Sequence, residues 1–437
     1  MFHNITLLIT FLLLLIGGYD RSEALSATTD PEAAKTAASS KKILLNDQVA
    51  LHRYEVPSQA LLEWYAWRSS RPALLLYSNS PLMQATTPTI QNNLIQHLAG
   101  KDESALRYDI ANPAILPQMT LHTALVGELF SAVYWVMPFD IAITELSIDI
   151  FRQQMIQIGA LNNEEAQTLT LHEGVFSGEV HGVPFHALHP QAKFAIKGPV
   201  VFHFDLSYLS PLYKGEIKTP LYPLIYQTLD KLSNLKVEAV TAGFSYSQIS
   251  GEVPLGSRFV GEVFAQLFKQ PNMLKEKLPA AWVQRANALY LPDLFNVGQA
   301  RDILMMLSEN NPADASLHYA LYHASRGSSS TRQGALDHLG EAVRRDPTYA
   351  LEYLVLAPKA REKGRPDEAL RILSLAREAN PDNPFIALEL VHSMIEMGHG
   401  DTGVPILKEL LTLDWSTAFY PEMPGYLEQL LSEVDSK

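Results

Sequence analysis

The sequence predicts an α/β domain with a mainly parallel sheet, followed by an all-α domain of helical repeats. Two observations support this fold class. Near the C-terminus helix-breaking residues recur every 34 positions, as in Pro347 and Pro381 or Gly364 and Gly398. A fixed period of that length indicates helical hairpins that stack to bury a shared core. Earlier in the chain, short β-branched and aromatic runs alternate with amphipathic stretches, which is typical of an α/β domain.

The first 44 residues are predicted to lie outside the folded domains. Ile5 to Ile16 form an apolar run, shorter than the roughly 20 residues that span a membrane. We expect residues 1–24 to be a signal peptide cleaved after Ala24, with an uncleaved membrane anchor as the alternative. Residues 25–44, rich in Ser, Ala and Thr, are predicted to be a disordered linker. The chain has no cysteine, so we expect a periplasmic or secreted bacterial protein without disulfides.

Residues 45–290 are predicted to form the α/β domain. Its strands are predicted from short apolar runs and its helices from amphipathic stretches between them. The predicted strands cover residues 73–77, 132–137, 199–204 and 237–242. The predicted helices cover residues 145–158, 221–235 and 257–269. In such domains functional residues gather at the carboxyl ends of the strands.

Composition and motifs argue against several functions. The chain carries 47 acidic and 34 basic residues, for a net charge of −13, and has no basic cluster. This balance disfavours a nucleic-acid partner. The phosphate-binding glycine loops, the Gly-x-Ser-x-Gly nucleophile motif and the His-Glu-x-x-His zinc motif are absent from the sequence.

His203 and Asp205 are the strongest catalytic candidates, because they stand at the carboxyl end of a predicted strand. The segment from His203 through Arg258 resembles the arginase/deacetylase-like (ureohydrolase) superfamily, in which an Asp-x-Asp strand end ligates a catalytic metal. The resemblance implies Mn²⁺ or Zn²⁺ held by His203 and Asp205, and hydrolysis of a C–N bond. Asp140, which follows another predicted strand, is a third candidate ligand by position.

The sequence departs from that superfamily pattern at two places. Ser207 stands where the second aspartate is expected, and the earlier strand end at residues 77–81 has no carboxylate or histidine. A structural alternative therefore stays open. His203 and Asp205 would be a hydrogen-bonded pair that braces the sheet, and Asp140 would cap a helix near Thr144.

Three histidines, His181, His186 and His189, form the densest histidine cluster of the sequence. On a strand, positions 181 and 189 face one way and 186 the other. We therefore expect no metal site there, and a strand and turn instead.

Residues 291–437 carry the repeats. The second repeat shows large and small apolar residues, then Gly364, then Ala369, Leu373 and Ala376, then Pro381. This pattern is similar to that of tetratricopeptide repeat (TPR) proteins. We count three repeats and a leading helix, with Trp415 in place of the last proline and a kink expected at Pro358.

The resemblance to TPR proteins implies that the first helix of each hairpin lines a concave surface that binds a protein or peptide partner. The repeat register places six residues near that surface, with Arg361 and His392 the first to test: Leu351, Leu354, Arg361, Phe385, Leu388 and His392. The alternative is that the apolar members pack against the α/β domain or a terminal cap.

Three functions follow as hypotheses. We prefer a non-enzymatic interaction protein of the cell envelope, without a cofactor, in which the α/β domain is a degenerate second platform. The alternative is the metal-dependent C–N hydrolase described above, in which the repeats recruit substrate. A carbohydrate- or peptidoglycan-binding protein is the third, suggested by aromatic residues for which core packing is the alternative: Trp64, Trp67, Trp135 and Tyr208.

Overall fold

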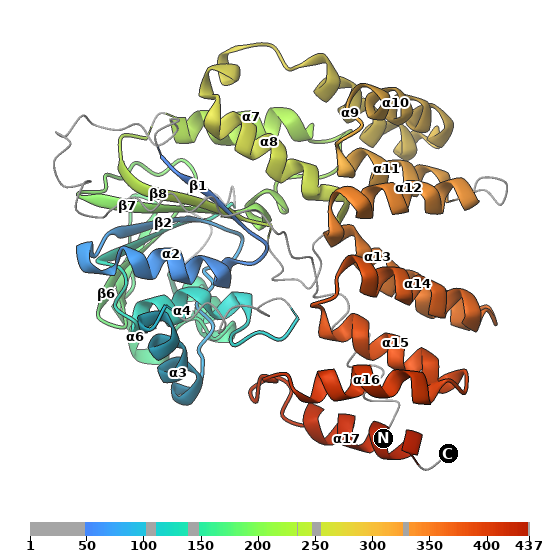
Figure 1. The fold of residues 1–437 in the computed structure, drawn as a ribbon. Coiled ribbons are helices and arrows are strands. Elements are labelled where there is room, and N and C mark those ends of the chain that lie inside the picture. Colours follow the sequence, from blue (N-terminus) through green and yellow to red (C-terminus); the bar gives the residue numbers. More distant parts are fainter. Residues whose placement is uncertain are drawn as a thin grey trace.

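A computed structural model describes residues 49–101, 111–138, 148–233, 235–246, 255–326 and 332–435. The predicted signal peptide, the linker and Asp140 lie outside these residues. Among the helices of the described residues, none is long and apolar enough to cross a membrane. The molecule has two parts, an α/β domain and an arc of helices that curves beside it (Figure 1).

The α/β domain is built on one mixed sheet of eight strands, in the order β1-β8-β7-β2-β3-β6-β5-β4. Strands β1, β8, β7, β2, β3 and β6 run parallel to one another, whereas β5 is antiparallel to β6 and β4 is antiparallel to β5. The prediction of a mainly parallel sheet is therefore corrected to a mixed one. The strands are β1 (Leu51–Tyr54), β2 (Ala73–Tyr77), β3 (Ala132–Val136), β4 (Thr170–His172), β5 (Val175–Val180), β6 (Val183–Leu188), β7 (Pro199–Asp205) and β8 (Glu238–Ser245).

Helices cover both faces of the sheet. Alternation along β2 sends Leu74 and Leu76 to one face and Leu75 to the other, which separates two apolar cores. One core receives α2 (Leu61–Ala66), α3 (Pro88–Ala99), α4 (Thr120–Val126), α5 (Ile148–Gln157) and α6 (Asn163–Thr168). The other receives α7 (Leu221–Ser233) and α8 (Arg258–Lys269). Figure 1 shows these two layers.

The antiparallel end of the sheet was not recognised from the sequence. Strand β4 is short and exposed throughout, and the sequence of β5 mixes apolar with polar residues and a glycine, so neither shows the apolar run of a buried strand. Two residues in left-handed conformations, Glu173 and Gly174, form the turn between them.

The helical arc consists of hairpins with two buried cores, a small one among α9, α10 and α11 and a larger one that extends from α11 to α17. Its helices are α9 (Ala280–Tyr290), α10 (Val297–Asn310), α11 (Ala315–Ser325), α12 (Arg332–Arg345), α13 (Leu351–Glu362), α14 (Pro366–Ala379), α15 (Pro384–Glu396), α16 (Gly400–Leu411) and α17 (Met423–Asp435). The residues that define the period are buried in the larger core: Ala335, Leu339, Ala342, Ala369, Leu373, Ala376 and Leu407. The prediction of stacked helical hairpins is confirmed by these contacts.

Local sequence explains where these helices end. Gly364 and Gly398 have φ angles of 67° and 76°, in the left-handed region that ends a helix at little cost for glycine. Asp346 and Asn383 accept hydrogen bonds from backbone N–H groups at the starts of the following helical segments. Helix α13 runs through Pro358 without interruption.

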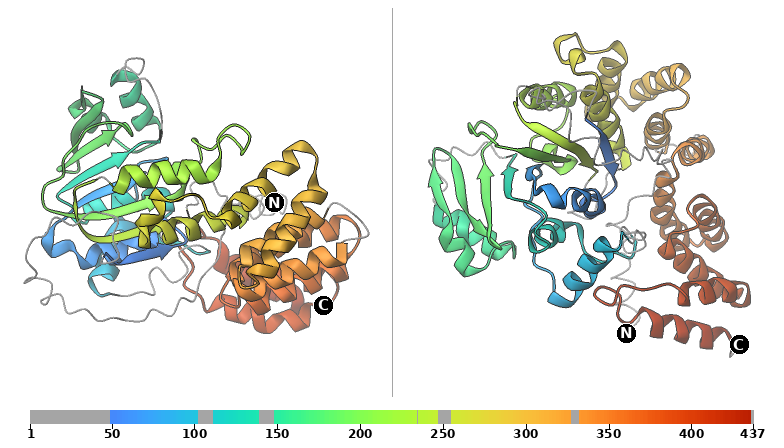
Figure 2. Two further views of the ribbon diagram at one scale, coloured as in Figure 1. Left: turned by 90° about the horizontal axis from the view of Figure 1, so that it is seen from above. Right: turned by 60° about the vertical axis from the view of Figure 1, so that its left-hand side comes forward.

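Helix α9 joins the two parts of the molecule. It forms a hairpin with α10, which is the leading helix predicted from the sequence. The array therefore begins with a complete hairpin. On its other side Trp282 stacks on Tyr222 of α7, with the ring centroids 5.4 Å apart. The first hairpin is therefore seated on the α/β domain, as the two views of Figure 2 also show.

Candidate functional site

The carboxyl ends of β7 and β8 bring together a histidine, a serine and an aspartate. These strands are parallel neighbours, and their register pairs His203 with Gly243 and Asp205 with Ser245. The Ser245 hydroxyl lies 3.0 Å from His203 Nε2 and donates to Asp205 Oδ2 at 2.5 Å. The other carboxylate oxygen, Oδ1, accepts from the backbone N–H of Ser207 at 3.0 Å. The sequence therefore placed His203 and Asp205 correctly at one strand end. The two side chains are not bonded to each other directly, because the Ser245 hydroxyl lies between them.

The order of these bonds fixes the protonation of the histidine. Ser245 has one hydroxyl proton and gives it to Asp205, so it accepts the proton of His203 Nε2. The Nδ1 atom then carries a lone pair, and it is buried without a hydrogen-bond partner. Burial lowers the pKa of His203 to about 3, so the ring is neutral at physiological pH.

This cluster is closed to solvent. His203, Asp205 and Ser245 each have 0% exposure. The imidazole ring stacks on Tyr54 and meets Trp64 edge to face, with centroids 6.0 and 5.4 Å away. In a catalytic triad the histidine lies between the acid and the nucleophile. Here the serine lies between, so the geometry favours a brace at the end of the sheet over an activated hydroxyl.

The two positions that depart from the superfamily pattern touch one another. Asn79, just beyond β2, donates its backbone N–H to the Ser207 hydroxyl at 3.2 Å. A hydroxyl thus bridges two strand ends where the superfamily would place a second carboxylate. Among the described residues, no group of three or more His, Cys, Asp and Glu could hold a metal ion. A Mn²⁺ or Zn²⁺ site that also used Asp140 stays a prediction.

The clustered histidines have separate partners. His186 on β6 hydrogen-bonds through Nδ1 to the Ser177 hydroxyl at 2.9 Å, and His189 Nδ1 accepts from the N–H of Gln191 at 3.3 Å. His181 stands in the β5–β6 turn, 3.6 Å from a Glu165 carboxylate oxygen. Each ring is thus engaged with its own neighbours.

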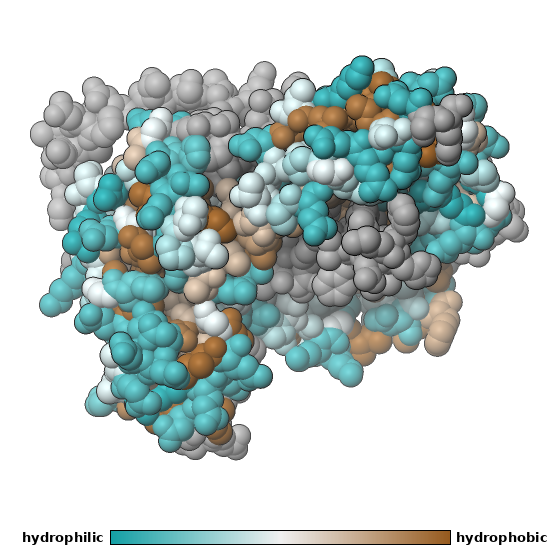
Figure 3. Space-filling view, turned by 90° about the horizontal axis from the view of Figure 1, so that it is seen from below, coloured by the Kyte–Doolittle hydropathy of each residue, from teal (hydrophilic) through white to brown (hydrophobic). Residues whose placement is uncertain are grey.

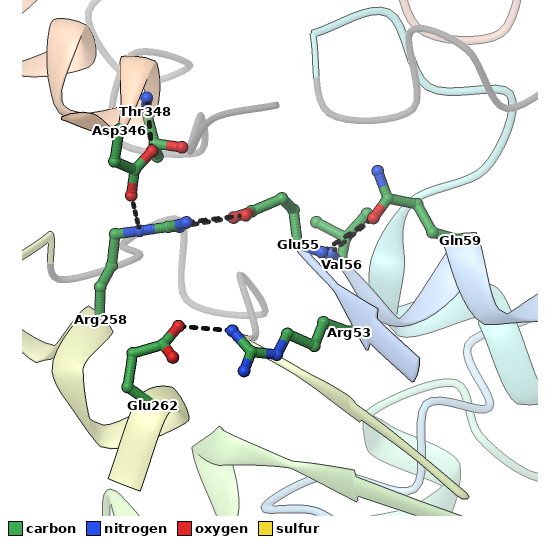
Figure 4. Close-up of polar contacts among 8 residues, drawn as sticks. All are labelled: Arg53, Glu55, Val56, Gln59, Arg258, Glu262, Asp346 and Thr348. Carbon is green, nitrogen blue, oxygen red and sulfur yellow. Dashed lines mark hydrogen bonds and ion pairs between the residues drawn. The ribbon is translucent and has the colours of Figure 1, made fainter. Parts of the chain in front are cut away.

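The junction between the α/β domain and the array is built on Arg258, the first residue of α8. Its guanidinium donates to both carboxylate oxygens of Glu55, at 2.7 and 3.0 Å, and through Nε to Asp346 at 3.0 Å. Figure 4 shows that Glu55 comes from the end of β1 and Asp346 from the array. The side chain also lies 4.5 Å from the ring centroid of Tyr246. A buried cation with two carboxylates therefore fixes three segments together.

The prediction that four apolar residues lie at the concave surface is corrected, because their side chains are buried. Leu354, Phe385 and Leu388 are 3%, 2% and 1% exposed, and Leu351 is buried with them in the core of the array. Phe385 packs on Trp415 and Tyr420, with centroids 5.9 and 5.3 Å away. The packing alternative accounts for them.

The two polar candidates on the array are partly buried and engaged within it. Arg361 pairs with Glu389 at 2.9 Å and lies 3.5 Å from a Glu396 oxygen. His392 Nε2 lies 2.6 Å from the Tyr426 hydroxyl, and burial lowers the pKa of this histidine. A role of either in partner binding stays a prediction.

The aromatic residues of the carbohydrate hypothesis are mostly packed. Trp64, Trp135 and Tyr208 are buried in the α/β cores, and the Trp135 indole donates to the Ser78 carbonyl at 3.1 Å. Trp67 donates to Glu63 at 3.0 Å within one helical turn. The face of the molecule seen from below is mainly hydrophilic, with smaller separate hydrophobic areas (Figure 3).

Sequence reasoning missed the partners of Arg258. No local pattern predicted that Glu55 and Asp346 contact Arg258, because each is more than eighty residues from Arg258 in the chain. Arg258 itself offered a clue. It opens a strongly apolar helix, and a charged residue so close to an apolar face usually has a buried partner.

No protein-family model matches the chain, and no curated protein matches it. The solved structures that match include a mutant form of MamA and a TPR protein. A mutant form of MamA is 17% identical with a TM-score of 0.23, and the match covers 37% of this chain and 96% of that one. The protein TTC0263, a thermophilic TPR protein in Thermus thermophilus, is 19% identical with a TM-score of 0.22, covering 42% and 96%. Scores this low carry no argument about function, and none of these comparisons supports the arginase-like resemblance of the middle domain.

Proposed function

We propose that this protein is a non-enzymatic interaction protein of the bacterial cell envelope that binds a protein or peptide partner through its helical repeats. The observation that carries the proposal is the stack of helical hairpins around two buried cores, an architecture that offers a long side-chain surface to a partner. Its placement in the envelope rests on the apolar segment near the N-terminus.

The strand-end cluster supports a non-enzymatic role. Its serine is buried, its carboxylate already accepts two hydrogen bonds, and its histidine is held neutral. These groups are used to join β7, β8 and the segment that follows β7.

Site-specific photocrosslinking in cells tests the binding role. A photoreactive residue replaces Glu362, which follows Arg361 on α13, or Glu396, which lies 3.5 Å from Arg361, both of them exposed. It replaces the exposed Asn93 of α3 as the matched control. We expect a discrete adduct of one molecular mass from the array positions and none from the control. Equal patterns at all three positions, or no adduct at either array position, would exclude binding at this surface.

The metal-dependent C–N hydrolase remains the second candidate, because His203 and Asp205 lie at one strand end, where both hydrogen-bond to Ser245. Elemental analysis of residues 42–437, purified without chelator or histidine tag and then loaded with Mn²⁺ or Zn²⁺, separates the two. We expect less than a tenth of an equivalent of either metal. One or two retained ions per chain, lost in Asp205→Ala without unfolding, would favour the hydrolase.

A further inference from the structure

The turn between β5 and β6 carries a histidine that contacts a second histidine on α4. His181 and Gly182 form this two-residue turn, both with left-handed φ angles, of 49° and 73°. The His181 ring meets the His122 ring edge to face, with the centroids 4.8 Å apart and the planes at 89°. Because His122 lies within α4, this contact joins the turn to a helix from an earlier part of the chain.

Hydrogen bonds hold the same turn on α6. One carboxylate oxygen of Glu165, Oε1, accepts from the backbone N–H of His181 at 3.1 Å and lies 3.6 Å from His181 Nδ1. The Thr168 hydroxyl, at the end of α6, accepts from the backbone N–H of Glu179 at 3.0 Å. The turn and α6 are therefore bound by directed polar contacts, whereas the contact with His122 is between two rings.

His122 is placed where a positive charge is unfavourable. The residue is 7% exposed, and its Nδ1 atom is buried without a hydrogen-bond partner. The titratable groups that act on it from the neighbouring elements are His181 of the turn and Glu165 of α6. That carboxylate already accepts two backbone N–H groups, from His181 and Asn162. One engaged carboxylate therefore faces two imidazoles, and protonation of both rings leaves an excess of positive charge.

We propose that His122 and His181 form an acid-sensitive clasp, in which the neutral rings hold the β5–β6 turn against α4 and the protonated rings release it. The clasp lies near the antiparallel edge of the sheet, where β4 is the exposed last strand. Release there breaks fewer contacts than opening of the central strands, so the rest of the α/β domain stays folded. Val180 and Val183, which flank the turn and are 1% and 3% exposed, become accessible in the released state.

The direction of the pH dependence follows from the burial of His122. Burial, and after it His181, lowers the pKa of His122 to about 4, against an opposing effect of Glu165. In the released state the ring is in water, with an ordinary pKa of about 6.5. Between these values the released state binds more protons, so release is rarest above pH 6.5 and increases as pH falls toward 4. From pH 7 to pH 5 the equilibrium constant for release should rise about twentyfold.

Hydrogen exchange of the intact protein measures this release. The backbone amides of residues 179–183 are followed at pH 7 and pH 5, and each rate is divided by the intrinsic rate at that pH. We expect their protection to fall about twentyfold, and exchange at pH 5 to be unaffected by about 1 M urea, because local release exposes little surface. Equal urea dependence in the turn and in β7 would mean that the turn opens only with the whole domain, and would overturn the proposal.

Two histidine variants assign the effect. In His122→Gln the fall in protection between pH 7 and pH 5 should shrink to less than about twofold, because the buried titrating group is gone. His172→Gln, which removes an exposed histidine from the adjacent β4, should keep the fall of about twentyfold. An unchanged fall in His122→Gln, or its loss in His172→Gln, would remove His122 as the sensor.

The unsubstituted protein supplies a second test that does not depend on the folding of a variant. The Cε1–H resonance of His122, followed by NMR as the pH is lowered, should titrate with a midpoint near pH 4. Exchange at residues 179–183 should rise over the same range and level off near that midpoint. A midpoint near the ordinary histidine value of about 6.5 would show that the ring takes up a proton without release of the turn, and would exclude the clasp.

Discussion

At the scale of single residues, charge and burial together decide what each polar group does. His203, Asp205 and Ser245 have residue types that could support catalysis, and the sequence located the first two. Their burial and bond order, which depend on β8 lying beside β7, favour a structural role. The sequence of one strand end does not specify which strand lies beside it, or whether that strand buries its polar side chains.

The depressed pKa of His203 predicts a dependence of stability on pH. The unfolded chain has an ordinary histidine with a pKa of about 6.5, whereas the folded value is about 3. Between these values the unfolded state binds more protons, so this contribution is complete above pH 6.5 and is lost as pH falls toward 3. From pH 7 to pH 5, the free energy of unfolding measured with urea should fall by about 2 kcal/mol more in the parent protein than in His203→Gln. The exposed His172→Gln should keep the parent slope; an equal slope in His203→Gln would contradict the assignment.

The buried Arg258 cluster predicts a large cost of substitution. Arg258→Ala leaves Glu55 buried without its cation, which should lower the free energy of unfolding by about 3–5 kcal/mol. The control is Arg53→Ala, whose pair with Glu262 is exposed and should contribute less than about 1 kcal/mol. Urea denaturation followed by tryptophan fluorescence measures both. Similar losses in the two variants would show that burial does not strengthen the Arg258 pair.

At the scale of elements, helices were predicted better than strands. The 34-residue period located the hairpins because each helix carries its own apolar stripe and its own terminators. Strands β2, β3, β7 and β8 were found because they are buried runs. Strands β1, β4 and β5 were not predicted, because they are partly or fully exposed edge or near-edge strands without an apolar run.

A matched pair of glycines tests the repeat design. Gly364 has a φ angle of 67° at a helix end, where any other residue is strained, so Gly364→Ala should destabilise by about 1 kcal/mol. Gly340 lies inside α12 with no neighbouring atom within 4 Å of the position that an alanine methyl group would occupy, so Gly340→Ala should stabilise by about 0.5–1 kcal/mol. Thermal unfolding followed by circular dichroism compares them. The same sign for both would contradict the role of Gly364 as a helix terminator.

At the scale of the whole molecule, the array depends on the α/β domain. Trp282 of helix α9 stacks on Tyr222, and Arg285 of the same helix lies 4.5 Å from the ring centroid of Phe259. A fragment of residues 280–437 loses both contacts and should unfold at lower urea concentration than the array in the full chain. Hydrogen exchange of α11 and α12 in the two proteins provides the measurement. Equal protection would mean that the array is an independent domain.

The sequence by itself determined the repeat period, the helix ends and the strand that carries His203 and Asp205. These are local properties, fixed by side-chain periodicity and by residues such as Gly364 that tolerate special backbone angles. Only the tertiary structure decided that Leu354 and Leu388 are buried and that Arg258 joins Glu55 to Asp346. It also decided that Asn112 bonds to Ser416, in the turn after α16. The physical reason is distance along the chain: these partners are separated by 88 to 304 residues, and no local pattern specifies which of many compatible groups will meet.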